Sequence, residues 1–131
     1  MDSPPPVFEY VPTPRPEDND AVMRTLPPGS LVVNATGLGK DAPGSPITDA
    51  APFPDRGTAW DFNYRGDLVF LDQARRQSVD RHLHVEDGWR YFIHGWLAVI
   101  AEVFHRTIPV SGPGFEELCA IAGRERRRER S

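Results

Sequence analysis

The distribution of proline constrains the fold of this chain more than any other feature of its sequence. Twelve of the 14 prolines lie within residues 1–54, and none lies between Asp55 and Ile108. Proline fixes φ and removes a backbone donor, so it interrupts helices and strands. Nine of the 13 aromatic residues fall between Trp60 and Phe104. We therefore expect a loop-rich first half and a core-forming second half.

Composition then excludes several classes of protein. The chain has 131 residues, which is at most one domain, and its 39 % hydrophobic residues allow a modest core. Its apolar runs are too short to cross a bilayer, and its acidic, proline-rich start is unlike a secretory signal. The one cysteine, Cys119, cannot form an internal disulfide. These features predict a cytoplasmic protein that is not inserted in a membrane.

Charge is concentrated at the C-terminal end. Residues 124–130 contain five arginines and two glutamates, whereas the net charge of the whole chain is −4. The remainder is therefore clearly acidic and has no broad basic face for nucleic acid. We expect a frayed, solvated helix end here. A basic tail that binds RNA or an acidic partner is the alternative.

The hydrophobic pattern predicts strands that alternate with helices. The expected strands are Ser30–Asn34, Ala59–Tyr64 and Leu83–Val85, with a further β-prone run at Val7–Val11. The expected helices are Asp18–Leu26, Asp67–Gln77 and Trp89–Phe104, the last with apolar residues at helical spacing for over four turns. A Gly/Pro-rich loop should cover Gly37–Gly57. Alternation of this kind predicts an α/β fold with a parallel sheet, in which the continuous apolar strand Ser30–Asn34 is buried on both faces.

Polar residues follow each of the three core strands. They lie at Asn34–Gly37, Asn63–Gly66 and Glu86–Gly88. Ligands of open parallel sheets bind beyond the carboxyl ends of the strands, so these three turns could line one binding rim. The alternative is that Asn34 and Thr36 cap a turn and that Gly88 only permits entry to a helix.

Other motifs fail on physical grounds. Gly37-Leu-Gly39-Lys40 resembles a dinucleotide or phosphate loop, but Pro43 and Pro46 forbid the helix that must open there, and Asp41 would repel phosphate. His82, His84 and Glu86 alternate as metal ligands on one strand face would, although we favour a solvated strand edge. No G-x-S-x-G elbow accompanies the serines.

The strand ends and the last predicted helix together resemble the shikimate dehydrogenase family. The resemblance is carried by Leu31-Val-Val-Asn-Ala-Thr-Gly-Leu-Gly39, Trp60-Asp-Phe-Asn-Tyr64 and Val85-Glu-Asp-Gly-Trp-Arg-Tyr-Phe92, and spans residues 30–106. The resemblance implies that residues 30–106 form the second half of a Rossmann-like NADP-binding domain, whose parallel sheet is closed by a long C-terminal amphipathic helix. Residues 1–29 then form a proline-rich N-terminal segment, and residues 107–131 form a C-terminal segment with an Arg-rich tail.

The resemblance also implies site residues. The N-A-T turn would run along the ribose and nicotinamide of NADP, with NAD as a possible alternative, and the D-G helix opening would meet the nicotinamide. The implied cofactor-binding residues are Asn34, Ala35, Thr36, Gly37, Gly88 and Tyr91, the last where the family often has methionine. Tyr64 would lie near the carboxylate of a shikimate-like substrate. His94 occupies the stretch where the family usually has a glutamine that touches substrate hydroxyls.

Other parts of the family pattern have no counterpart in this sequence. The family's catalytic lysine and aspartate lie in an N-terminal substrate domain, and its Gly-rich phosphate loop precedes the matched region. Lys40, the only lysine, lies in the Gly/Pro loop and is not assigned a catalytic role. We therefore expect a truncated dehydrogenase with no catalytic residue of its own and little activity alone. The alternative is a non-enzymatic remnant or small nucleotide-binding module that needs a partner, with an exposed sheet edge that allows homo-oligomers.

Overall fold

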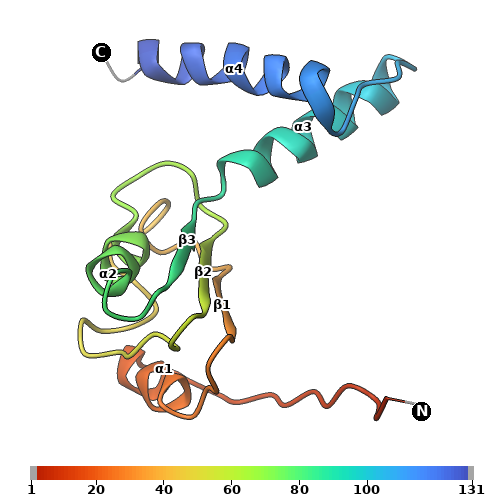
Figure 1. Cartoon of the computed structure of the whole chain (residues 1–131). Helices are drawn as coiled ribbons and strands as arrows, with labels where there is room; N and C mark the ends of the chain where they lie inside the picture. The colour runs from red at the N-terminus through yellow and green to blue at the C-terminus, as the bar shows by residue number, and fades with distance from the viewer. Residues whose placement is uncertain (1–2, 130–131) are drawn as a thin grey trace.

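The computed structural model describes residues 3–129, in which three parallel strands and four helices form an α/β structure (Figure 1). The helices and strands follow in the order α1 (Pro16–Met23), β1 (Leu31–Asn34), β2 (Thr58–Asp61), α2 (Val69–Gln77), β3 (His84–Glu86), α3 (Trp89–Val103) and α4 (Gly112–Glu129). The strand order is β1-β2-β3. Leu31 pairs with Thr58, and Thr58 pairs with His84, so all three strands end at the same edge. The predicted α/β class with a parallel sheet is confirmed.

The hydrophobic core lies between the sheet, α2 and the loop that precedes β2. Phe70, Leu71 and Ala74 form the buried face of α2 and are at most 1 % exposed. Phe53, from the loop, meets Phe70 edge to face, with ring centroids 5.5 Å apart. Burial of these side chains from water supplies the main driving force for packing the loop on the helix.

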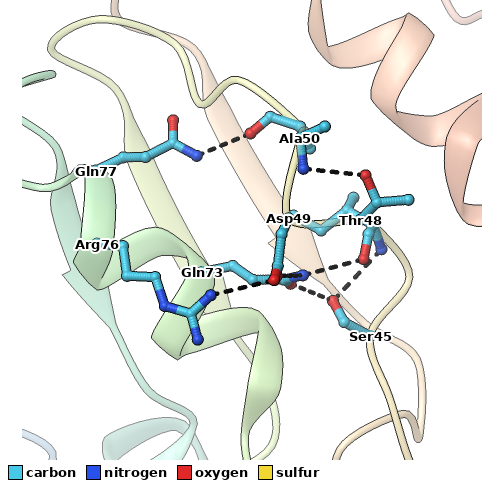
Figure 2. Close-up of polar contacts among 9 residues, drawn as sticks. Ser45, Thr48, Asp49, Ala50, Gln73, Arg76 and Gln77 are labelled. Carbon is cyan, nitrogen blue, oxygen red and sulfur yellow. Dashed lines mark hydrogen bonds and ion pairs between the residues drawn. The ribbon is translucent and has the colours of Figure 1, made fainter.

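Two glutamines of α2 hold the proline-rich loop in place (Figure 2). Gln73 accepts a hydrogen bond from Ser45 Oγ at 2.6 Å and donates to Ile47 O at 3.2 Å and to Asp49 Oδ1 at 2.9 Å. Gln77, one turn later, donates to Ala51 O at 2.8 Å and accepts from the Phe53 N–H at 3.0 Å. Gln73 and Gln77 lie four residues apart on one face of α2. Their side chains therefore provide hydrogen-bond partners for loop groups that have no partner in a regular helix or strand.

The N-terminal β-prone run does not form a strand. Residues 7–11 are extended coil, and Val7, Phe8 and Tyr10 are each at least 90 % exposed. The prediction of a strand at Val7–Val11 was wrong because a strand needs a neighbour, and the proline-rich stretch that follows carries this segment away from the sheet (Figure 1).

The prediction that β1 is buried on both faces was also wrong. Leu31 is 57 % exposed and Val33 is 38 % exposed, whereas Asn34 is buried. β1 is an edge strand of a small sheet, and α2 packs on β2 and β3 rather than on β1. An apolar run therefore shows that a strand forms but not how many layers cover it.

Helix α3 does not close the sheet as expected. It leaves the carboxyl end of the sheet and pairs with α4, and Ile93 is its one buried residue (Figure 1). Arg90 pairs with Glu116 at 2.7 Å across the two helices, and His94 stacks on Phe115 with centroids 4.3 Å apart. Trp96, Val99 and Val103 stay more than half exposed on the other side of α3. No helix in residues 3–129 combines the length and apolar character needed to cross a membrane.

Four of the predicted helices and strands begin or end at other residues than expected, for local reasons of backbone geometry. α1 ends at Met23 rather than Leu26, before Pro27 and Pro28. β2 ends at Asp61 because its side chain turns the chain by accepting the Asn63 N–H at 2.9 Å. α2 starts at Val69 because Leu68 adopts a left-handed conformation, with φ 51°. β3 starts at His84, after a left-handed His82 with φ 49°.

Candidate functional site at the carboxyl edge of the sheet

Hydrogen bonds join the three polar turns into one rim. The Gly88 N–H donates to Asn63 O at 3.0 Å, and Asn63 Nδ2 donates to Thr36 O at 2.9 Å. The Phe62 N–H donates to Asn34 O at 3.0 Å, which extends the β1–β2 ladder to this edge. The three turns predicted from sequence are therefore in direct contact. Asn63, the central member of this chain of bonds, is itself buried.

The Asn34–Gly37 turn is shaped by one buried side chain. Asn34 Oδ1 accepts the Thr36 N–H at 3.0 Å and Thr36 Oγ1 at 2.7 Å, and Thr36 Oγ1 in turn accepts the Leu38 N–H at 3.2 Å. Asn34 is 1 % exposed, whereas Ala35, Thr36 and Gly37 are exposed. Asn34 thus has the turn-forming role considered from sequence, and the three residues after it form the accessible part of the turn.

Gly88 lies where two backbones almost touch. A Cβ at this position would be 1.9 Å from Phe62 O, far inside van der Waals contact. The next residue begins α3, and its N–H donates to Asp87 Oδ1 at 2.9 Å, which satisfies a free donor of the first turn. Glycine is therefore required here by close packing of the second and third turns, and Gly88 itself is buried.

An aromatic cluster stands beside the rim. Tyr91, on the first turn of α3, stacks on Phe62 with ring centroids 4.7 Å apart and an interplanar angle of 12°. Trp60 meets Tyr91 edge to face at 6.1 Å, and its Nε1 donates to Asp87 O at 3.1 Å. Tyr91 is 54 % exposed, so part of its ring is open to a ligand.

The two residues expected on the substrate side contact the terminal helices. Tyr64 stacks on Phe92 with centroids 4.1 Å apart, and its carbonyl accepts a hydrogen bond from Arg126 Nη2 of α4. His94 stacks on Phe115 of α4. Tyr64 thus lies in the second turn of the rim and contacts α3 and α4 from there, whereas His94 lies at the α3–α4 contact rather than among the turns.

Arg126 is a residue that sequence reasoning missed. Its guanidinium lies 4.7 Å from the centre of the Trp89 ring, and its Nη1 is 3.9 Å from Asp87 Oδ2. Two cavities, of about 550 and 530 Å³, flank these residues, and both are lined by Trp89 and Arg126. The prediction of a wholly frayed, solvated tail was wrong for Arg126 because an arginine can stack on an aromatic face while its N–H groups bind oxygen.

Asp61 is a second residue that was missed. It is 0 % exposed at the end of β2, and its Oδ2 has no hydrogen-bond partner within residues 3–129. Burial raises the pKa of the Asp61 carboxyl above its usual range, and the bond from the Asn63 N–H opposes that shift only in part. Asn34, which faces Asp61 in the strand register, likewise has a buried Nδ2 without a partner. The sequence did contain a signal for a buried carboxyl here, because the other residues of β2 are Thr, Ala and Trp.

The histidines do not form the alternating set that a metal site would need. His82 lies before β3 and is 3.8 Å from Asp55, whereas His84 pairs with Glu86 at 3.1 Å. Both histidine side chains are more than two-thirds exposed. Within residues 3–129, no three His, Cys, Asp or Glu side chains gather in a metal-binding group.

Comparison of the chain with protein-family models, with curated proteins and with solved structures found no match.

Proposed function

We propose that this chain forms the nicotinamide side of a Rossmann-like NADP-binding domain of the shikimate dehydrogenase type. The observation that supports this best is the hydrogen-bonded rim, in which Thr36, Asn63 and Gly88 meet at the carboxyl edge of three parallel strands. That edge is where open α/β sheets bind nucleotides. NAD in place of NADP is compatible with the same rim.

The residues at the rim are chemically suited to a nicotinamide nucleotide. The exposed turn Ala35–Gly37 offers backbone groups and the Thr36 hydroxyl to a ribose, and the half-exposed Tyr91 ring offers a flat surface to a nicotinamide. NADP, when bound, supplies the hydride acceptor. Tyr64 would lie on the side of a shikimate-like substrate. This sequence contains neither the family's catalytic lysine–aspartate domain nor its phosphate loop, so these residues would bind and orient rather than transfer a proton.

A second candidate function is a small nucleotide-binding module that needs a partner. The open edge of β1 favours it, because Leu31 and Val33 are exposed there. In this case the same rim binds the nucleotide, and the partner completes the sheet.

Titration of the ¹⁵N-labelled chain with parts of the cofactor tests the proposal. Nicotinamide mononucleotide should shift the amide signals of Thr36, Gly37 and Gly88 with a Kd of about 1 mM, because the phosphate-loop half of the site is lacking. An adenosine 2′,5′-bisphosphate should leave them unchanged. Tyr91→Ala should weaken mononucleotide binding, and Phe104→Ala, a control at an exposed aromatic residue at the far end of α3, should not.

Two results would contradict the proposal or its corollary. Absence of any shift at the rim with about 10 mM mononucleotide would reject a nicotinamide site. Shikimate turnover with NADP by the purified chain would reject the expectation that it is inactive alone.

A further inference from the structure

The sheet has an open edge along β1. Within the described residues, β1 has β2 on one side and no strand on the other, and Leu31 and Val33 are exposed. A groove of about 390 Å³ lies along this strand and is lined by all four of its residues, together with Thr13 and Thr36. An unpaired strand edge presents backbone donors and acceptors in the spacing that another strand requires.

The chain also contains a short segment suited to such an edge. Val7–Val11 is a five-residue run without proline, rich in β-branched and aromatic side chains, and prolines flank it at Pro6 and Pro12. Its apolar side chains are exposed, and no hydrogen bond or ion pair in residues 3–129 involves it. Its five residues are long enough to pair with all four residues of β1. The segment is therefore a β-prone run without a neighbouring strand, and β1 has an edge without one.

The segment cannot turn back onto β1 of its own chain. Every residue from 11 to 16 is either a proline or directly precedes one. Prolines fix φ and restrict the preceding residue to extended conformations, so this stretch is a stiff spacer. Thr13 lines the groove, but the chain before it runs outward from α1 and away from the sheet (Figure 1). Residues 7–11 therefore do not supply a strand to the β1 edge of their own chain.

We propose that Val7–Val11 of one copy pairs with the free edge of β1 in a second copy, and that the exchange is reciprocal in a two-fold dimer. Phe8 and Tyr10 lie on the same face of such a strand and would cover the exposed Leu31 and Val33. The added strand would also lie alongside Asn34 and Thr36, so each copy would form part of its partner's rim. This inference goes beyond the proposed nucleotide site and does not depend on it.

Sedimentation velocity and light scattering from about 1 to 200 µM protein test the dimer. The chain should be dimeric at the upper end of this range. In a parallel pairing with Phe8 opposite Leu31, the Glu9 N–H donates to Leu31 O, so Glu9→Pro removes a ladder donor and should weaken the dimer about tenfold or more. Glu9→Ala keeps the N–H and should not. Because the segment has no partner among the described residues of its own chain, both variants should melt like the wild type when monomeric.

Directed cross-linking tests the pairing itself. In a Cys119→Ser background, chains with Phe8→Cys are mixed with chains with Leu31→Cys and oxidised, and a mixed disulfide dimer should form. Val79→Cys, at an equally exposed position away from β1, replaces Leu31→Cys in the control and should not cross-link.

Three outcomes would overturn the proposal. The first is a monomer at about 200 µM. The second is a dimer that Glu9→Pro leaves intact. The third is a dimer lost with Trp96→Asp alone, which would assign association to the exposed side of α3. Mononucleotide binding by a strictly monomeric chain would reject the dimer and leave the proposed function standing.

Discussion

At the residue scale, two glycines near the same helix have opposite surroundings. Gly88 precedes α3, and a Cβ there would lie 1.9 Å from Phe62 O. Gly95 lies within α3, and a Cβ there would meet nothing within 4 Å. The first glycine is required by packing between two turns. The second lowers the stability of its helix, because glycine loses more backbone entropy than alanine.

We expect Gly88→Ala to destabilise the fold by about 3 kcal/mol or more, since a backbone carbonyl must move. Gly95→Ala, the matched control, should stabilise the fold by about 0.5–1 kcal/mol. Urea unfolding followed by circular dichroism measures both. Equal effects of the two substitutions would show that the Gly88–Phe62 contact does not limit the fold.

Asp61 should make stability depend on pH. Its folded pKa is raised by burial, so the unfolded chain loses this proton at lower pH than the folded chain does. Stability is therefore lost as pH rises from the usual Asp pKa, about 3.9, through the folded value. Asp61→Asn keeps an acceptor for the Asn63 N–H and removes the ionisation.

The stability of Asp61→Asn relative to the wild type should therefore increase between about pH 3.5 and pH 7. Thermal melts of both proteins across that range provide the measurement. Asp80→Asn, at an exposed position, should show no comparable trend. If the difference in stability between Asp61→Asn and the wild type stays constant with pH, then ionisation of Asp61 does not change the free energy of unfolding.

At the element scale, α2 supports the proline-rich loop through side chains. Gln73 is 5 % exposed and makes three hydrogen bonds to the loop, at Ser45, Ile47 and Asp49. Arg76, on the same helix, reaches Asp49 at 3.3 Å but is exposed, as is its partner. The buried amide leaves unpaired groups behind when it is removed, whereas the exposed ion pair is replaced by water.

Gln73→Ala should destabilise the fold by about 2–3 kcal/mol. Arg76→Ala should change it by no more than about 0.5 kcal/mol. Chemical denaturation of the two variants tests this contrast. Similar losses in both would indicate that the loop is held by its apolar residues alone.

The sequence predicted all three core strands and the first three helices, because each carries its own periodicity or apolar run. Helix α4 was not predicted in full, since its Gly112-Pro113-Gly114 start looks like a turn and its arginines look solvated. The partners of Arg126, which are Trp89 and Tyr64, are far away in the sequence. The three turns of the rim were predicted because parallel strands place their ends together. Asp61 and Arg126 were not, because burial and ring stacking depend on tertiary neighbours.

At the scale of the whole molecule, Arg126 connects the terminal helix to the sheet. It stacks on Trp89, donates to Tyr64 O and faces Asp87, so one side chain bridges α4 to two turns of the rim. Arg90 and Phe115 join α4 to α3 independently of that bridge. Removal of Arg126 should release the far end of α4 and leave the helix pair intact.

Arg126→Gln should lower hydrogen-exchange protection in the C-terminal half of α4 about tenfold and leave that of β2 unchanged. Arg124→Gln, on the exposed side of the same helix, should leave both unchanged. Exchange measured by mass spectrometry on the two variants tests the bridge. Unchanged protection in Arg126→Gln would show that α4 is held by α3 alone.

The parallel register has a consequence for how fast the chain folds. Among the described residues, no two strands are joined by a hairpin, since β1 reaches β2 only across the whole proline-rich loop and β2 reaches β3 only across α2. Each pairing must therefore close a long loop before it gains any ladder hydrogen bond. The helices can form locally and early, so we expect the rim, which exists only when all three strands have met, to form after them.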